Sequence, residues 1–171
     1  IQVSCNVFFY ETGRLLGIDN IDLYAKQCGL GVKTGVEIGE SAGILASPSY
    51  RTENGGTWQP GDVVQAAIGQ SDNAFTPLQL ATYCATIANN GTRLKTHLVK
   101  KVTNYSREQT LSETQPEVVA KTEISQSNLK AVQQAMRSVT QSGGTAISVF
   151  GKYRISIAAK TGTAENPGHS D

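Results

Sequence analysis

The C-terminal part of the chain changes its hydrophobic period, and this change constrains the fold more than any other feature. An apolar residue recurs at intervals of three, four and three residues at Leu129, Val132, Met136 and Val139. This spacing predicts an amphipathic helix from about Ser127 to Thr140. From Tyr153 to Ala159 apolar residues recur at every second position, the period of a strand with one buried face. The predicted strand runs on to Thr163. The two periods together predict an α/β (α+β) fold.

Capping signals predict three further helices. One runs from Val7 to Gly17, and a second begins at Asp19 as its cap and stops at Cys28. The third begins at Thr76-Pro77-Leu78-Gln79, where a capping box precedes a proline in the first turn, and ends at Asn89-Asn90-Gly91. Its expected buried face consists of Leu80, Ala81, Cys84, Ile87 and Ala88.

The remaining segments are less regular. Glycines and a proline interrupt the chain from Gly29 to Gln59 so often that this stretch is predicted to be a long surface excursion. Leu98 to Tyr105 is typical of a half-exposed strand, and Ser106 to Gln115 is polar enough for a loop.

Composition limits the class of protein. The chain has 171 residues, of which 39% are apolar and 17% charged, with a net charge of +1. It can therefore form a core, and it is neither a disordered tail nor a basic nucleic-acid binder. Its three cysteines are far apart and lack the spacing of a zinc site, so we expect no metal and no cofactor. Cys28 and Cys84 are predicted to be small buried apolar groups.

Lys160-Thr161-Gly162 is the first candidate binding element. On a strand, a lysine and hydroxyls can present a cation and donors to a carboxylate, while a glycine leaves room for a ligand. The tripeptide recurs at Lys33-Thr34-Gly35, where no alternation precedes it. We interpret that second copy as a solvated lysine beside a turn.

Ser4-Cys5-Asn6 is the second candidate element. A serine hydroxyl can relay a proton, and an asparagine amide can orient a substrate amide. Taken alone, the pattern favours Ser4 as a helix cap, and Ser71-Asp72-Asn73 has the same pattern. The pattern by itself does not choose between the two copies.

Three segments in order show a family resemblance. They are Ser4 to Tyr10, then Ile68 to Ser71 followed by Thr76 to Ala81, and then Ala159 to Glu165. In this order they resemble the transpeptidase domain of penicillin-binding proteins, most closely the monofunctional class B type of the β-lactamase-like superfamily. The resemblance covers nearly the whole chain and implies an antiparallel sheet flanked by helices, with a helical lobe. It selects Ser4 and Asn6 over Ser71, and it makes Ser71 and Lys33 structural.

The resemblance also implies roles. Ser4 would relay a proton, Asn6 would hold the substrate's peptide amide, and Lys160 would supply positive potential. Thr161 and Thr163 would bind the substrate's terminal carboxylate beside Gly162, and the Thr163 N–H would form half of an oxyanion hole. The reaction would be acyl transfer from D-alanyl-D-alanine stem peptides of peptidoglycan, and β-lactams would trap the acyl-enzyme.

One family element is missing from the sequence. The acylated serine of the family lies in an S-x-x-K motif before S-x-N, and only three residues precede Ser4. The string from Ser127 to Lys130 comes in the wrong order and is better explained by Ser127 as a helix cap. We therefore expect residues 1–171 to be a partial domain that also lacks the last sheet strands, with both ends looking like cuts. Alone, it should be inactive and marginally folded.

The resemblance finally implies partners and a location. We expect cell-wall morphogenesis proteins as partners, and an extracytoplasmic position with a membrane anchor preceding Ile1. A serine β-lactamase, a β-lactam sensor module and a soluble domain without a site remain alternatives. Steady hydrolysis of a penicillin would indicate the lactamase, and a fused transmembrane signalling domain would indicate the sensor.

Overall fold

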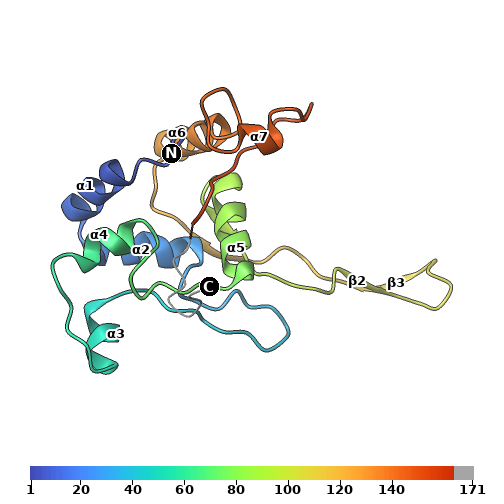
Figure 1. The fold of residues 1–171 in the computed structure, drawn as a ribbon. Helices are drawn as coiled ribbons and strands as arrows, with labels where there is room; N and C mark the ends of the chain where they lie inside the picture. The colour runs from blue at the N-terminus through green and yellow to red at the C-terminus, as the bar shows by residue number, and fades with distance from the viewer. Residues whose placement is uncertain (164–171) are drawn as a thin grey trace, which may run out of the picture. The chain divides into compact units, whose positions relative to one another are not determined.

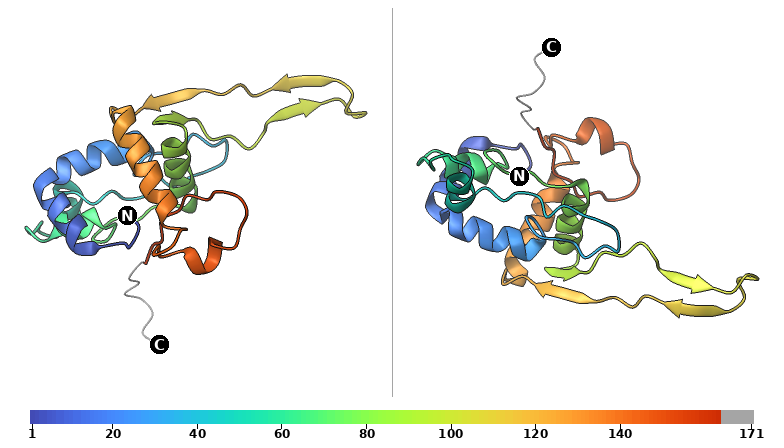
Figure 2. Two further views of the ribbon diagram at one scale, coloured as in Figure 1. Left: turned by 90° about the horizontal axis from the view of Figure 1, so that it is seen from above. Right: turned by 90° about the horizontal axis from the view of Figure 1, so that it is seen from below.

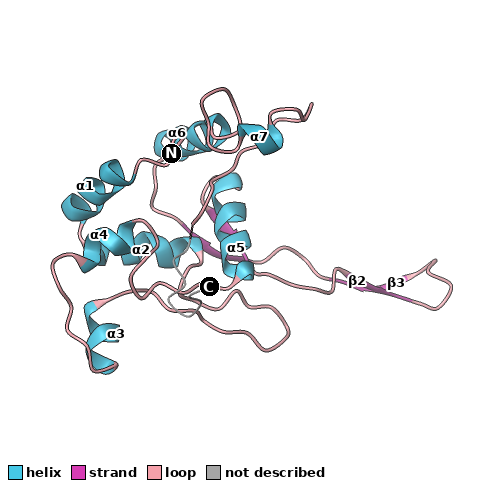
Figure 3. Ribbon diagram, in the orientation of Figure 1, coloured by secondary structure: helices cyan, strands magenta, loops and turns pink. Residues whose placement is uncertain are grey.

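The computed structural model describes residues 1–163, which form two compact units (Figure 1). Unit 1 contains Ile1–Leu23, Leu45–Asn73 and the chain from Ile124 onward, and unit 2 contains Tyr24–Ile44 and Ala74–Glu123. Helices and short antiparallel strands make up the described part, which confirms the predicted mixed class (Figure 3). None of its helices is long and apolar enough to cross a membrane.

Unit 1 begins with helix α1 (Asn6–Leu16), close to the predicted bounds. Gly17 ends it with a φ of 78°, a left-handed conformation that favours glycine. Helix α2 (Ile18–Cys28) follows at once, so Asp19 lies in its first turn and is not its cap, and the boundary between the units falls inside this helix. A Cβ added to Gly13 would lie 2.3 Å from the Cβ of Ala67, which explains the close packing of α1 on α4 (Asp62–Ala67).

Helix α3 (Pro48–Glu53) was not predicted, because it lies inside the glycine-rich stretch from Gly29 to Gln59. Its start follows ordinary capping rules: the Ser47 hydroxyl accepts a hydrogen bond from the Tyr50 N–H, and Pro48 occupies the first turn. Six residues are too few to show a helical period, so only the cap could have indicated it.

Helix α6 (Gln126–Ser138) confirms the predicted amphipathic helix. Leu129 and Val139 are 2% and 0% exposed, so the predicted apolar face contributes to the core of unit 1. The cap is Ser125, whose hydroxyl accepts from the Asn128 N–H, and Ser127 is not the cap. A short helix, α7 (Ile147–Phe150), follows.

The predicted strand from Tyr153 to Thr163 is wrong as an element of secondary structure. The described part of this segment has no strand, since no neighbouring backbone in residues 1–163 pairs with it as a ladder. Its alternation survives in part, because Ile157, Ala159 and Thr161 are half-buried while their neighbours are exposed. The Ala159 N–H donates to the Met136 carbonyl at 3.0 Å, which attaches this extended segment to α6.

Unit 2 is built on helix α5 (Pro77–Ala88), which has the predicted capping box of Thr76 and Gln79. The predicted buried face is wrong except at Ile87. The buried residues of this helix are Gln79, Thr82, Thr86 and Ile87, whereas Leu80 and Cys84 are exposed.

Hydrogen bonds explain why polar residues of α5 can be buried. The Thr82 and Thr86 hydroxyls donate to the carbonyls four residues earlier at 2.9 and 2.8 Å. The Gln79 side chain, 0% exposed, donates to the carbonyls of Val32 and Ala42 at 2.8 and 2.7 Å. A polar group that finds such partners inside the protein loses little by burial. Cys28 is also buried, as predicted, at 4% exposure.

Two small antiparallel sheets complete unit 2. Strand β1 (Thr92–Leu94) pairs with β4 (Val118–Lys121), and β2 (Lys101–Thr103) pairs with β3 (Thr110–Glu113). The second pair forms a hairpin that extends away from α5 (Figure 2). The strand predicted from Leu98 to Tyr105 is thus confirmed in part. The loop predicted from Ser106 to Gln115 is wrong at β3, whose side chains are all exposed and give no alternating signal.

Candidate functional site

The structure joins Ser4 and Lys160, which are 156 residues apart in the sequence. The Lys160 ammonium donates to the Ser4 hydroxyl oxygen at 2.9 Å and to the Thr161 carbonyl at 2.6 Å. Both residues belong to unit 1. Two of the predicted motif segments therefore meet in one place, through a donor that carries a charge and an oxygen that can also donate.

The backbone at Ser4 shows that this serine is not a helix cap. The N-cap of α1 is Cys5, which makes no side-chain capping bond, and the Ser4 hydroxyl is directed to Lys160 instead. Ser4 has a φ of 51°, a left-handed conformation that costs a residue other than glycine about 1 kcal/mol. The Ser4 N–H donates to the Ile1 carbonyl at 3.2 Å, so a tight turn holds this conformation.

Asn6 is near Ser4 in sequence but is not joined to the pair. It is the first residue of α1 and is exposed, and its carboxamide has no hydrogen bond to any residue in the described range 1–163. The structure thus leaves both functions of the amide group, donor and acceptor, available to another molecule.

The residues after Lys160 are held from two sides. The Thr161 hydroxyl lies 3.0 Å from the Thr145 hydroxyl, and the Thr163 carbonyl accepts from the Gln70 side chain at 3.0 Å. Gly162 is exposed, and an added Cβ would meet nothing within 4 Å. The last residues quoted for this motif, Ala164 and Glu165, lie outside the described residues.

Gln70 contacts the site, although no role was predicted for it from the sequence. It belongs to the segment from Ile68 to Ser71 that contributed to the family resemblance. It lies in the turn after α4, between Gly69 and Ser71, which have φ values of 84° and 64°. Its own N–H donates to the Gln65 carbonyl at 3.0 Å, and its carbonyl accepts from Asn73 at 3.1 Å. These bonds fix the backbone of the turn and direct the side chain to Thr163.

The pattern Ser71-Asp72-Asn73 has the structural role that the resemblance implied. The Arg51 guanidinium donates to Asp72 at 2.5 Å and to the Ser71 hydroxyl at 3.1 Å. Asn73 accepts from the Ala46 N–H at 3.0 Å. The three side chains thus tie α3 and α4 together and contribute nothing to the Ser4 and Lys160 pair.

Thr145 is a second residue that contacts the site and was not predicted from the sequence. It follows the turn Ser142-Gly143-Gly144, which lies between the helical period that ends at Val139 and the alternating period that begins at Tyr153. A threonine placed directly after two glycines was the available signal, but it could not show which residue the hydroxyl would meet.

The second copy of the tripeptide, in unit 2, binds a carboxylate of the protein itself. The Thr34 N–H, the Thr34 hydroxyl and the Gly35 N–H donate to Glu40 at 2.9, 2.8 and 2.8 Å. Burial of the Glu40 carboxyl opposes its ionisation, but these donors outweigh burial and hold its pKa below the usual range. The turn around Lys33 is therefore structural, as expected.

The remaining S-x-x-K string gives no catalytic arrangement. The Ser127 hydroxyl lies 3.0 Å from the Ser125 hydroxyl at the start of α6, and Ser127 and Lys130 are both exposed. No group of three His, Cys, Asp or Glu residues that could hold a metal ion occurs within residues 1–163.

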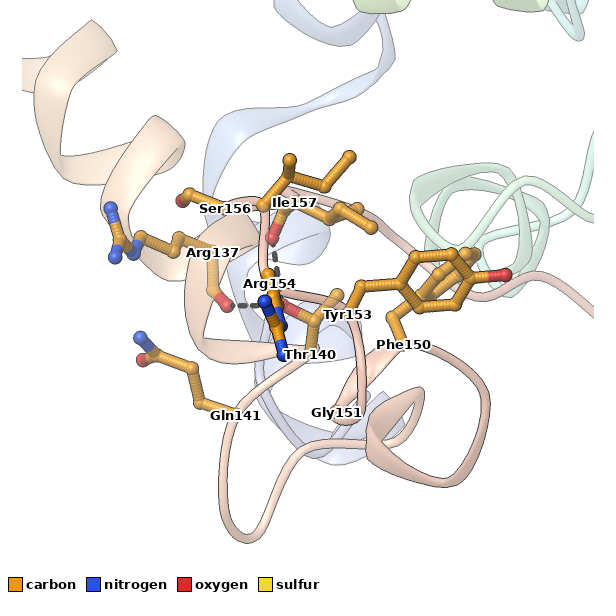
Figure 4. A pocket seen from close by; sticks show the side chains of 10 residues that line it. Arg137, Thr140, Gln141, Phe150, Gly151, Tyr153, Arg154, Ser156 and Ile157 are labelled. Carbon is orange, nitrogen blue, oxygen red and sulfur yellow. Dashed lines mark hydrogen bonds between the residues drawn. The ribbon is translucent and has the colours of Figure 1, made fainter.

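A cavity of about 280 Å³ lies at the end of α6, away from the predicted site residues (Figure 4). Its lining includes Arg137, Thr140, Tyr153 and Arg154. In its wall, the Thr140 hydroxyl donates to the Ile157 carbonyl at 2.7 Å. None of the predicted site residues lines this cavity, so the candidate site is the exposed surface around Ser4 and Lys160.

Known proteins resemble this chain in sequence and fold. The penicillin binding protein transpeptidase domain family matches residues 1–171. Penicillin-binding protein 2A of Bacillus subtilis is 34% identical over 97% of this chain and 25% of its own length. Peptidoglycan D,D-transpeptidase MrdA of Acinetobacter baumannii is 32% identical over 96% of this chain and 24% of its own.

A solved structure of PBP2 from Helicobacter pylori, in complex with MreC, has a TM-score of 0.81 and 28% identity. It aligns over 97% of this chain and 30% of that protein. The chain thus spans only about a quarter of the length of the curated relatives it matches. The match over all 171 residues and the class B type of these relatives confirm the resemblance, and the chain belongs to the penicillin binding protein transpeptidase domain family.

Proposed function

We propose that this chain is part of a peptidoglycan D,D-transpeptidase, in which it supplies the proton relay and the carboxylate-binding segment. The observation that carries the proposal is the hydrogen bond of 2.9 Å from Lys160 to Ser4. It joins the S-x-N and K-T-G segments in the pairing that a relay requires. The name of the related MrdA protein agrees with this reaction.

The direction of that bond defines what Ser4 can do. A charged lysine is only a donor, so the Ser4 oxygen accepts from Lys160 and keeps its own O–H to donate. Lys160 lowers the cost of negative charge on the oxygen, and Ser4 can then pass a proton to a leaving nitrogen. Lys160 also supplies the positive potential that attracts an anionic substrate.

The nucleophile comes from outside these residues in our proposal. A serine in an S-x-x-K motif N-terminal to Ile1 attacks the carbonyl of the penultimate D-alanine. The C–N bond breaks, the serine's proton reaches the leaving D-alanine through Ser4, and an ester to the enzyme forms. The amine of a second stem peptide then attacks the ester, which forms the cross-link and restores the serine. Residues 1–171 are accordingly a partial domain, in line with the short share of each relative that they cover.

The substrate is held by residues beside the pair. Thr161 and Thr163 bind the terminal carboxylate with their hydroxyls, next to the open surface at Gly162. The exposed carboxamide of Asn6 binds the peptide amide of the stem. The Thr163 N–H stabilises the oxyanion together with the N–H of the acylated serine.

Partners and location follow from the same proposal. β-Lactams acylate the serine, as the family's name implies. Cell-wall morphogenesis proteins bind the parent protein, and the related PBP2 solved with MreC supports this class of partner. The site acts on the extracytoplasmic face of the membrane, held there by a segment that precedes Ile1.

A turnover assay on the parent protein tests the proposed function. Incubated with peptidoglycan strands that carry pentapeptide stems, it should release D-alanine and form cross-links, and penicillin should block both. Lys160→Met should abolish the products. Steady hydrolysis of penicillin without cross-links would instead indicate a β-lactamase and would overturn the proposal.

Residues 1–171 expressed alone test the partial-domain proposal. We expect no covalent labelling by a fluorescent penicillin, because the nucleophile is not among them. Labelling that is lost in Ser127→Ala but kept in Ser4→Ala would contradict this expectation and would make Ser127 the nucleophile.

A further inference from the structure

Thr145 contacts Thr161 in the K-T-G segment and Gln2, two residues before Ser4. Its hydroxyl lies 3.0 Å from the Thr161 hydroxyl, and its N–H donates to the Gln2 carbonyl at 3.2 Å. The Gln2 side chain in turn donates to the Ser142 carbonyl at 2.9 Å. One short loop therefore holds the residues just before Ser4 and reaches the residue just after Lys160.

The loop that carries Thr145 has little freedom. Gly143 has a φ of 80°, and Gly144 is buried, where an added Cβ would lie 2.2 Å from the Val139 carbonyl oxygen. On the other side of Thr145, Ala146 is 5% exposed and its N–H donates to the same Val139 carbonyl at 2.9 Å. The position of Thr145 is thus set by the core at the end of α6.

Before an anion binds, either of the two hydroxyls can donate to the other. A carboxylate only accepts hydrogen bonds, so Thr161 must donate its single proton to it. The Thr161 oxygen can then only accept from Thr145, which must donate. The result is a chain of bonds in one direction, from Thr145 to Thr161 to the carboxylate, and each bond polarises the next.

We propose that Thr145 is a positioning residue that orients the Thr161 hydroxyl toward the terminal carboxylate of the stem peptide. This inference rests on the proposed function, because it assigns the carboxylate-binding role to Thr161. It adds a residue from a third segment to the site. In this role, Thr145 contributes to the preference of the site for anionic substrates.

A purely structural role for Thr145 predicts a different result. Thr140 offers the comparison, because it is buried and its hydroxyl donates to the Ile157 carbonyl in the same extended segment. Loss of such a bond weakens the segment for every substrate alike. Thr145 is exposed, and its hydroxyl bonds to a side chain that can itself donate to a ligand. The effect of removing the Thr145 hydroxyl on kcat/KM should therefore depend on the charge of the substrate.

The test compares two thioester substrates on the full-length parent protein. Both have a D-alanyl acyl group, and the leaving group carries a carboxylate in one and a primary amide in the other. Thr145→Val should lower kcat/KM for the carboxylate thioester by roughly 3- to 10-fold, the value of one hydrogen bond, and should leave the amide thioester nearly unchanged. Thr145→Ser, which keeps the hydroxyl, should restore the preference.

Three further variants separate the outcomes. Thr161→Val should remove the preference for the carboxylate, and adding Thr145→Val to it should cost nothing more. Thr140→Val, the structural control, should lower Tm and affect both thioesters by the same factor. An equal loss on both thioesters in Thr145→Val, or no loss on either, would overturn the inference alone. A wild-type protein that forms no acyl-enzyme with either thioester would overturn the proposed function first.

Discussion

The same tripeptide occurs in both units, and its two copies differ in what their donors meet. Lys33-Thr34-Gly35 binds the carboxylate of Glu40 with two N–H groups and a hydroxyl. Lys160-Thr161-Gly162 binds no carboxylate of residues 1–163, and its lysine is hydrogen-bonded to Ser4. The donors of Thr34 and Gly35 are thus satisfied by a carboxylate within the fold. Only the copy at Lys160 has its lysine hydrogen-bonded to the Ser4 hydroxyl, so context and not the pattern makes it a candidate site.

Removing the two lysines should separate the copies most strongly. In the parent protein, Lys160→Met should slow acylation by a penicillin by roughly 10²- to 10³-fold, because the relay loses its charged donor. Lys33→Met is the matched control. Its acylation rate should stay within about twofold of the wild-type rate, since Lys33 is exposed and has no part in the proposed relay. Stopped-flow acylation rates provide the measurement. Similar losses in both variants would mean that the two copies do not differ as described.

Removing the serine of each S-x-N pattern should also separate the two copies, with a smaller loss of acylation rate than Lys160→Met. Ser4→Ala should slow acylation by about 10²-fold, because no hydroxyl remains to pass the proton. Ser71→Ala should leave the rate unchanged and lower the free energy of unfolding by about 1 kcal/mol, through the lost bond to Arg51. Acylation rates and urea unfolding measure the two effects. A slow Ser71→Ala variant with normal stability would contradict this assignment.

Gln70 should have a moderate effect, because it acts through Thr163. Gln70→Ala removes the bond of 3.0 Å to the Thr163 carbonyl and should lower kcat/KM by roughly 3- to 10-fold. Gln59→Ala, at an exposed glutamine of the same unit, is the control and should have no effect. Equal rates for the two variants would show that Thr163 needs no such support.

Glu40 should have the smallest effect on activity and a measurable effect on stability. Its pKa is lowered in the folded protein, so its carboxylate stabilises the fold above the unfolded pKa, about 4.3, and this contribution disappears as the pH falls through the folded value. Glu40→Gln should therefore lower Tm at pH 7, and this difference in Tm should shrink as the pH falls below the unfolded pKa, with acylation unchanged at pH 7. A difference in Tm that grows toward low pH would contradict the sign of this shift.

Much of the local structure could be predicted from the sequence because its causes are local. The cap at Thr76 and the glycine at position 17 identify α5 and the end of α1, since each acts within one turn of helix. The period from Leu129 to Val139 identifies α6. Strand β3 and the burial of Thr82 and Thr86 could not be predicted in this way, because they depend on a partner strand and on hydrogen bonds inside the fold.

In the candidate site, too, only the features with local causes could be predicted. Patterns could propose Ser4 and Lys160, but each had a second copy, and the family resemblance was needed to choose between the copies. The Gln70 side chain meets a residue 93 positions away, and Thr145 meets one 16 positions away. No local pattern encodes which atom a side chain will meet at such separations. The strand expected from Tyr153 to Thr163 failed for the same reason, since a strand needs a paired neighbour.

The position of the acylated serine tests the central claim most directly. The parent protein is incubated with a penicillin, digested, and its peptides are sequenced by mass spectrometry. We predict one penicilloyl adduct, on the serine of an S-x-x-K motif N-terminal to Ile1, with Ser4 unmodified. An adduct on Ser127 or Ser4, or no adduct at all, would contradict the claim that Ser4 and Lys160 serve a nucleophile outside this chain.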